Sequence, residues 1–359
     1  MELILVRETW SHMESVSGFD PLFACFTENE SIQARSFYVS DFVNAAKTSR
    51  INRWLKSAQK LSIQKALSPF VELKHERLAQ VLVKQMQENP KALVLLSVTE
   101  NQFAPSLSEL PEQELKRLVL FVHQPPAWFR LFWKDMRVFS KVKAVVCLCE
   151  EQASFFEAHQ SAPVIRIRHG VNLDFFQPML NKPMGSKKIV FVGQWMRDME
   201  TLSKTFQRLA EQDSSLTLHC VLQRRFRNHP ALLSLARSSQ VFWYDHIQAN
   251  DLKKLYQTAD LLLLPLLDST ANNAFVEAAA CGLPVVSTLI GGASEYVYTP
   301  AARLVEPANS EALAKACMAM LAQIPNEPNW SNEIRQFAEK NLSWPLQVNR
   351  CLTAIKSLS

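Results

Sequence analysis

The sequence predicts an α/β protein built from two doubly wound domains. Short apolar runs alternate with longer helical patterns through the first half of the chain, which is the βα rhythm of a parallel sheet. Residues 178–188, PMLNKPMGSKK, then replace this periodicity with proline, glycine, serine and lysine, as an interdomain linker does. The rhythm restarts after the linker. A chain of 359 residues also exceeds what one compact core usually organises, so we expect two domains facing each other across a cleft.

Each domain has its own series of expected strands. In the first half these are the apolar runs 2–6, 92–98, 117–122, 143–148 and 164–167. In the second half they are 188–193, 216–222, 240–244, 260–265, 284–287 and 302–305, with helices such as 198–212 and 272–281. Ligands of such sheets bind beyond the carboxyl ends of the strands, so we expect a ligand at the loops after Val192, Pro265 and Val286.

The domain limits follow from the linker and from the last helical pattern. We place an N-terminal Rossmann-like domain at 1–178 and a C-terminal one at 179–342. In the remaining segment, 343–359, Ser343 is a plausible cap and Pro345 a first-turn proline of a final helix.

Composition and charge exclude several classes of protein. Seven scattered cysteines argue against a disulfide framework, and Cys147 and Cys149 would point to opposite faces of a strand rather than converge on a metal. A net charge of +5 and the lack of a recognised module argue against nucleic acid as a partner. The first residues, MELILVRETW, lack the basic region and cleavage site of a signal peptide, and no apolar run approaches the ~20 residues of a membrane span. We expect a cytoplasmic protein.

One stretch of the first half is unusually basic. Between Phe42 and Val71 there are six cations and no acidic residue, interleaved with apolar residues at helical spacing. This predicts a basic amphipathic helix that can lie peripherally on an anionic membrane through residues 47–65, on the inner face. The alternative is a helix whose apolar stripe packs on the core while its basic side is solvated, and we favour that interpretation.

The most informative stretch is residues 265–297, PLLDSTANNAFVEAAACGLPVVSTLIGGASEYV. Asn272 or Asn273 can cap a helix whose free N–H groups would face an anion such as a diphosphate. Glu277 then lies about one turn into the helix, and its two oxygens match the two vicinal hydroxyls of a ribose. An exposed helix glutamate is the alternative. Gly282, Gly291 and Gly292 follow in a chain that has only seven glycines, which marks these loops as working backbone.

This segment resembles the C-terminal signature of the retaining GT-B glycosyltransferases of glycosyltransferase family 4, the glycosyl transferases group 1. Ile167 to Asn172 is similar to the family's turn before the linker, Phe191-Val192-Gly193 to its Phe-Val-Gly strand end, and Tyr256 to Leu264 to its Tyr-x-x-Ala-Asp strand. The resemblance implies a GT-B fold, a nucleotide-sugar donor held by the second domain, an acceptor held by the first, and transfer with retention. It does not imply a metal or a cofactor. It also implies that a last helix, 343–359, crosses back to the first domain.

The chain departs from the family pattern at two places. Where the family has an arginine and then a lysine-glycine pair after its strand-end glycine, here Gly193, this chain has Gln194 and Met199-Glu200. Arg197 is the nearest cation for the diphosphate, with Arg224 or Arg225 as further candidates. Ser269 stands where the first motif glutamate is expected, so the donor sugar must be contacted instead by neighbouring polar groups, namely Asp268, Asn272 or Asn273.

Two candidate positions lie in the first half. His123 ends a predicted strand before the rigid pair Pro125-Pro126. The resemblance puts a functional histidine there, to bind the donor sugar or stabilise charge in the transition state. Gly18 lies where the family has a glycine-containing loop near the diphosphate, and His12 is in the same loop. An ordinary core histidine and an ordinary helix-start turn are the alternatives.

Together these features predict a metal-independent retaining hexosyltransferase of glycan biosynthesis. It would move a sugar from a nucleoside diphosphate to an unidentified glycan, lipid or small-molecule hydroxyl, with His123, Glu277 and Arg197 as the central residues. Because the lysine-glycine pair and the first glutamate are missing, a catalytically inactive nucleotide-sugar scaffold or sensor is the alternative. A GT-B-type epimerase is a third possibility.

Overall fold

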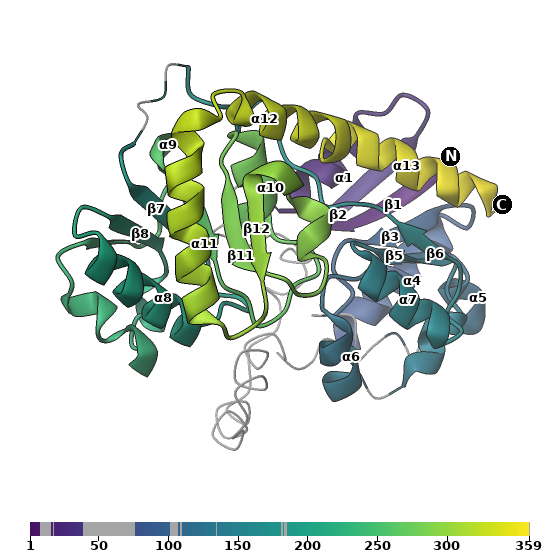
Figure 1. Cartoon of the computed structure of the whole chain (residues 1–359). Helices are drawn as coiled ribbons and strands as arrows, with labels where there is room; N and C mark the ends of the chain where they lie inside the picture. Colours follow the sequence, from purple (N-terminus) through teal and green to yellow (C-terminus); the bar gives the residue numbers. More distant parts are fainter. Residues whose placement is uncertain are drawn as a thin grey trace. The chain divides into compact units, whose positions relative to one another are not determined.

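The computed structural model describes residues 1–7, 16, 18–38, 76–100, 107, 110–133, 135–180, 182 and 185–358. The chain divides into two compact units (Figure 1). Unit 1 comprises Met1–Arg168 and Trp344–Ser359, and unit 2 comprises His169–Ser343. The basic stretch 47–65 and His12 lie outside the described residues, so the membrane contact stays a prediction.

Unit 1 is built on a six-stranded sheet in the order β2-β1-β3-β4-β5-β6, with every adjacent pair parallel. Its strands are β1 (Glu2–Arg7), β2 (Gln33–Tyr38), β3 (Leu93–Leu96), β4 (Leu118–Phe121), β5 (Ala144–Cys147) and β6 (Val164–Arg166). The central strands read LVLL, LVLF and AVVC, and they are almost entirely buried. Continuous apolar runs of this kind form strands that are covered on both faces.

Helices pack on this sheet, and one of them comes from the second of the two chain segments that form unit 1. They are α1 (Asp20–Thr27), α4 (Glu76–Glu88), α5 (Glu112–Leu115), α6 (Pro126–Phe132), α7 (Glu150–Ala158) and α13 (Trp344–Ser357). The last of these packs against α1, where the rings of Phe19 and Trp344 lie 5.3 Å apart. The N–H of Arg168 donates to Oε1 of Gln347 at 2.9 Å. Unit 1 therefore includes a helix from the far end of the chain.

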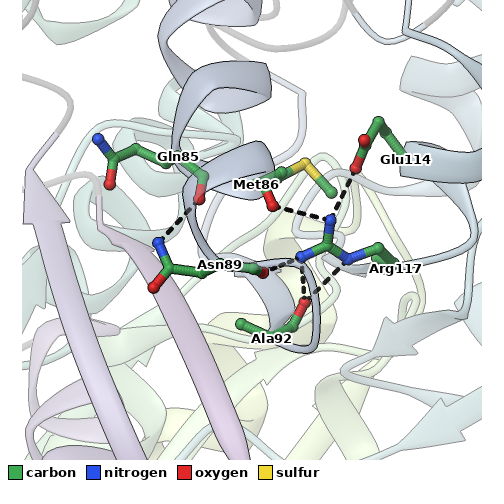
Figure 2. Close-up of polar contacts among 6 residues, drawn as sticks. All are labelled: Gln85, Met86, Asn89, Ala92, Glu114 and Arg117. Atoms are coloured by element: carbon green, nitrogen blue, oxygen red, sulfur yellow. Dashed lines mark hydrogen bonds and ion pairs between the residues drawn. The ribbon is translucent and has the colours of Figure 1, made fainter.

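An arginine joins α4 to the next strand in unit 1 (Figure 2). Arg117 donates from Nη1 to the carbonyl of Met86 at 3.1 Å and to Glu114 at 2.9 Å, and from Nη2 to the carbonyls of Asn89 and Ala92. The last carbonyls of a helix have no partner within the helix, and a cation there also opposes the helix dipole. Arg117 thus closes the end of α4 and fixes the connection to β3.

Unit 2 repeats the design with the order β12-β11-β10-β7-β8-β9, again parallel throughout. Its strands are β7 (Lys188–Val192), β8 (Thr217–Val221), β9 (Val241–Tyr244), β10 (Leu261–Leu264), β11 (Val285–Thr288) and β12 (Ala302–Val305). Its helices are α8 (Met199–Gln212), α9 (Ala249–Thr258), α10 (Asn273–Ala280), α11 (Ser310–Gln323) and α12 (Trp330–Asn341).

The predicted fold class is confirmed: the chain folds into two α/β units with parallel sheets. The expected strands are found, and one strand that the sequence did not predict is added. This is β2, QARSFY, which forms the edge of the sheet beside β1. An edge strand is less completely covered than a central one, so QARSFY contains polar residues and does not form an apolar run.

All seven cysteines are free, and all but Cys25 are buried. Burial raises the pKa of the Cys147 thiol, as expected for a packing residue rather than a reactive one. Within the described ranges, no helix is long and apolar enough to cross a membrane. The same residues contain no group of three or more His, Cys, Asp or Glu that could hold a metal ion.

Candidate functional site

In unit 2 the candidate site begins at the amino end of α10. Asn272 is the N-cap of this helix, and its Oδ1 accepts the N–H of Ala274 at 3.0 Å. Asn273 is the first residue of the helix. The choice between the two asparagines is thereby decided by the structure: Asn272 forms the cap. The same Oδ1 accepts a second hydrogen bond, from Nη2 of Arg197 at 3.0 Å.

Arg197 lies in the loop between β7 and α8, which is paired with the loop after β10. An antiparallel bridge joins Arg197 to Leu266, and the N–H of Leu267 donates to the carbonyl of Met196 at 2.9 Å. The guanidinium also donates from Nε to the carbonyl of Val192 at 2.9 Å and from Nη1 to that of Trp195 at 2.8 Å. Three of its five N–H donors are therefore used to hold the loops together.

The charge of Arg197 is retained at this position. Burial lowers the pKa of Arg197 to about 10, opposed by the nearby Tyr256 and Glu277. The group is thus cationic at neutral pH. Gly193 makes room for it, since a Cβ at this residue would lie 2.9 Å from Nη2 of Arg197, and the φ of Gly193 is +90°. The strand-end glycine and the arginine are one structural feature.

Glu277 is buried within unit 2 and is only 3% exposed, which excludes the alternative of a surface glutamate. Its Oε2 accepts the hydroxyl of Tyr256 at 2.9 Å. Burial raises the pKa of Tyr256, and the Glu277 carboxylate raises it further, so the phenol stays protonated and can donate. The sequence analysis missed Tyr256 as a partner of Glu277 because it counted this residue only as part of a strand motif.

Asp268 and Ser269 form the turn before α10. Oδ1 of Asp268 accepts the N–H of Ser269 at 2.7 Å, and the carbonyl of Ser269 accepts the N–H of Gly292 at 2.8 Å. Gly291 has φ +51°, and a Cβ at this residue would clash with that carbonyl oxygen. Ser269 is 7% exposed, and its Oγ has no hydrogen-bond partner in the structure as described. A close approach of two loops therefore shapes this turn.

Arg225 lies apart from these contacts, in the short turn after β8. Its side chain is exposed, donates to Gln223 at 3.0 Å and stacks on Phe226. Arg224 is also exposed. Arg227 instead turns inward, where Nε donates to the carbonyl of Leu222 at 3.0 Å and the guanidinium lies over the ring of Trp243. The sequence analysis did not single out Arg227, because three arginines within four residues look alike in the sequence.

In unit 1 the candidate site is the turn that follows β4. Nε2 of His123 lies 2.6 Å from the carbonyl of Ser97. A carbonyl only accepts, so Nε2 carries the hydrogen. Burial lowers the pKa of His123 to about 4, and the ring is neutral at physiological pH. Its edge-to-face partner is Phe19 at 4.3 Å, directly after Gly18, whose φ is +72°. The structure thus brings the Gly18 turn and His123 together.

Comparison with known proteins shows which family model the second unit matches and which fold the chain shares. Residues 186–323 match the family model described as glycosyl transferases group 1. The chain folds as a sucrose-phosphate synthase from Thermosynechococcus elongatus does, with a TM-score of 0.72 over 99% of this chain and 98% of that one at 17% identity. The fold is GT-B. HepE of Anabaena, in complex with UDP and glucose, shares this GT-B fold, with a TM-score of 0.67 over 99% of this chain and 100% of that one at 12% identity.

One curated relative is similar in sequence. The lipopolysaccharide glucosyltransferase WaaG of Escherichia coli strain K12 is 33% identical over 92 residues. The aligned stretch covers a quarter of this chain and a quarter of that protein. The predicted GT-B fold is therefore confirmed over the whole chain, and sequence similarity to glycosyltransferases is concentrated in unit 2.

Proposed function

We propose that this chain is a glycosyltransferase that uses a nucleoside-diphosphate sugar and transfers the sugar with retention to a hydroxyl acceptor. The observation that carries the proposal is that Oδ1 of Asn272 accepts hydrogen bonds from Arg197 and from the amino end of α10. These residues lie within the segment that matches glycosyl transferases group 1. A half-buried cation beside the positive amino end of a helix favours a bound anion such as a diphosphate. The complex of HepE with UDP and glucose supports a nucleotide-sugar donor for this fold.

In this proposal the residues of unit 2 stabilise the leaving group. Charge develops on the departing diphosphate, and the two remaining N–H donors of Arg197 and the positive end of the α10 dipole would stabilise it. Glu277 would hold the ribose through the carboxylate that Tyr256 orients. The leaving phosphate itself would accept the proton of the acceptor hydroxyl, so no strong protein base is needed.

His123 of unit 1 would contact the donor sugar. Its pKa of about 4 keeps it a neutral imidazole, which suits a hydrogen-bonding role rather than proton removal. The hydrogen on Nε2 is engaged with Ser97, and the ring is packed against Phe19. We therefore assign His123 to binding and orientation of the sugar, and we expect transfer to be independent of pH near neutrality as far as this group is concerned.

Glu277→Gln tests the donor site. Glutamine keeps the size of the side chain and an oxygen for Tyr256, but it removes the charge and leaves one fewer acceptor for the ribose. We expect nucleotide affinity to fall about 10-fold or more, because a lost hydrogen bond to a charged group costs about 1.5–3 kcal/mol. Calorimetric titration with UDP, GDP, ADP and their sugar conjugates measures it.

Glu333→Gln is the matched control, since Glu333 of α12 also accepts a tyrosine hydroxyl, that of Tyr298, at 3.1 Å. Affinity should be unchanged in this variant. Equal affinity of wild type and Glu277→Gln would overturn the ribose assignment. Because Ser269 replaces the family's first glutamate, a non-catalytic nucleotide-sugar sensor is the second candidate. Binding of a donor without hydrolysis or transfer would favour the sensor.

A further inference from the structure

The main chain at the end of β4 is held by two buried side chains that come from other parts of unit 1. Oε1 of Glu100, in the loop after β3, accepts the N–H of His123 and, at 2.7 Å, the N–H of Gln124. From the other side, Nε2 of Gln152 in α7 donates to the carbonyls of Val122 at 3.2 Å and Gln124 at 2.8 Å. We call the two side chains of Glu100 and Gln152 the β4 clamp.

The chemistry of each member fits its place in the β4 clamp. Glu100 faces two converging N–H donors, so it must be an acceptor, and a carboxylate accepts more strongly than a neutral oxygen. Gln152 uses both ends of its carboxamide, because its Oε1 also accepts the N–H of Leu148 at 2.8 Å. Glu100 is 2% and Gln152 0% exposed, so neither is a surface residue that happens to reach the turn.

The β4 clamp acts on the residue that the proposed function needs. It fixes the main chain on both sides of His123, while Ser97, three residues before Glu100, holds the imidazole. The side chain that accepts the His123 N–H and the carbonyl that contacts its ring thus belong to the same loop after β3. We propose that Glu100 and Gln152 are positioning residues that set the orientation of His123 for glycosyl transfer. This proposal rests on the proposed function, and its first test does not depend on activity.

The first test measures the hydrogen bond itself. In protein labelled with ¹⁵N-histidine, the amide signal of His123 is assigned by its disappearance in His123→Gln. We expect this amide proton to move upfield in Glu100→Ala and by less in Glu100→Gln, which keeps one acceptor oxygen. The control is Glu114→Gln, which changes a buried carboxylate at Arg117 and should leave the signal in place. An unchanged His123 signal in both Glu100 variants would overturn the clamp.

The second test asks whether the β4 clamp works through His123. Misplacement of a catalytic group by a small distance costs up to about 100-fold in rate, so we expect kcat of donor hydrolysis to fall roughly 10-fold in Glu100→Ala with little change in donor KM. In a His123→Ala background the same substitution should cause no further fall. Gln152→Glu, which cannot donate to the two carbonyls, should behave like Glu100→Ala.

A fall of equal size in both backgrounds would overturn the positioning role, because a general loss of structure acts with or without His123. Glu114→Gln should lower the melting temperature without lowering kcat, which separates stability from positioning. If Glu100→Ala fails to fold, Glu100→Gln supplies the same cycle with a smaller effect. Absence of turnover in the wild type would overturn the proposed function and the catalytic part of this inference, whereas the amide signal would still decide the clamp.

Discussion

The two candidate sites are held in place by different means. In unit 1, the turn at His123 depends on side chains that reach it from 23 and 28 residues away in the sequence, Glu100 and Gln152. In unit 2, the loops at Arg197 and Asn272 are joined mainly by main-chain bonds, one arginine and a close approach at Gly291. The contact between Arg197 and Asn272 spans 75 residues of sequence, yet both residues lie within the segment that the family model matches.

The largest loss of stability is expected at Gly291 of unit 2, where there is no room for a side chain. In Gly291→Ala the Cβ would clash with the carbonyl of Ser269, and the residue has φ +51°. Overpacking costs about 1–3 kcal/mol and the left-handed conformation about 1–2 kcal/mol, so we expect a loss of about 3–4 kcal/mol in unfolding free energy. The Asp268-Ser269 turn should move, and nucleotide binding should be lost. Denaturant titration and calorimetry measure the two effects.

Gly185→Ala is the matched control for that change. Gly185 also has a left-handed φ, +75°, but nothing lies within 4 Å of its added Cβ. It should lose only the conformational cost of about 1 kcal/mol and keep full nucleotide affinity. Similar losses in the two variants would show that the close approach in unit 2 does not hold the site.

A medium effect is expected from the arginine of unit 1. Arg117→Lys removes the forked contact with the end of α4 and with Glu114, because an ammonium cannot match that geometry (Figure 2). We expect a loss of about 2 kcal/mol in unfolding free energy, from two or more hydrogen bonds. Nucleotide affinity should not change, since Arg117 serves unit 1 alone. A loss of nucleotide affinity would contradict the assignment of nucleotide binding to unit 2.

The smallest effect concerns two histidines whose pKa is lowered by burial, one in each unit. Burial lowers the pKa of His123 to about 4, and burial together with Lys188 lowers that of His219 to about 4. The unfolded chain binds these protons near pH 6.5, so stability is full above that pH and falls between pH 6.5 and 4. Because solvent weakens these shifts, each histidine should contribute a loss of about 1 kcal/mol over this window.

Urea titrations across this pH range measure the acid loss. His123→Gln and His219→Gln should each make the dependence less steep, while the exposed His246, replaced by asparagine, serves as control. If both buried variants keep the slope of the wild type, protonation of these rings does not cause the loss. A change in one variant only would assign the acid sensitivity to that unit.

The fold was predictable because short stretches of sequence indicate most of its strands and helix caps. The short apolar run LLLL at Leu261–Leu264, bounded by Asp260 and Pro265, is typical of a buried parallel strand, and the polar turn before α10 supplies its own cap in Asn272. The edge strand β2 escaped prediction because QARSFY shows neither a continuous apolar run nor a strict polar-apolar alternation. Side-chain pairs such as Tyr256 and Glu277, 21 residues apart, also escaped, because no spacing rule links residues on different helices.

The same distinction explains which site residues were found. Gly193 and Glu277 lie in stretches that resemble family motifs, and Arg197 follows Gly193 by four residues and occupies the space that its missing side chain leaves. Glu100 lies in a stretch with no motif, and no pattern in the sequence indicates its contact with the main chain at His123. Polar side chains that hydrogen-bond to the main chain of a turn distant in sequence can therefore be identified only from the structure.

The position of α13 sets an order for biosynthesis. This helix follows all of unit 2 in the chain, yet it packs on α1 within unit 1. Domains usually fold as they emerge from the ribosome, the N-terminal one first. Here unit 1 waits for its last helix while unit 2, continuous from His169 to Ser343, can be completed. The nascent chain therefore keeps the surface of α1 uncovered until residues 344–357 have been synthesised, and we expect a chaperone to bind that surface in the meantime.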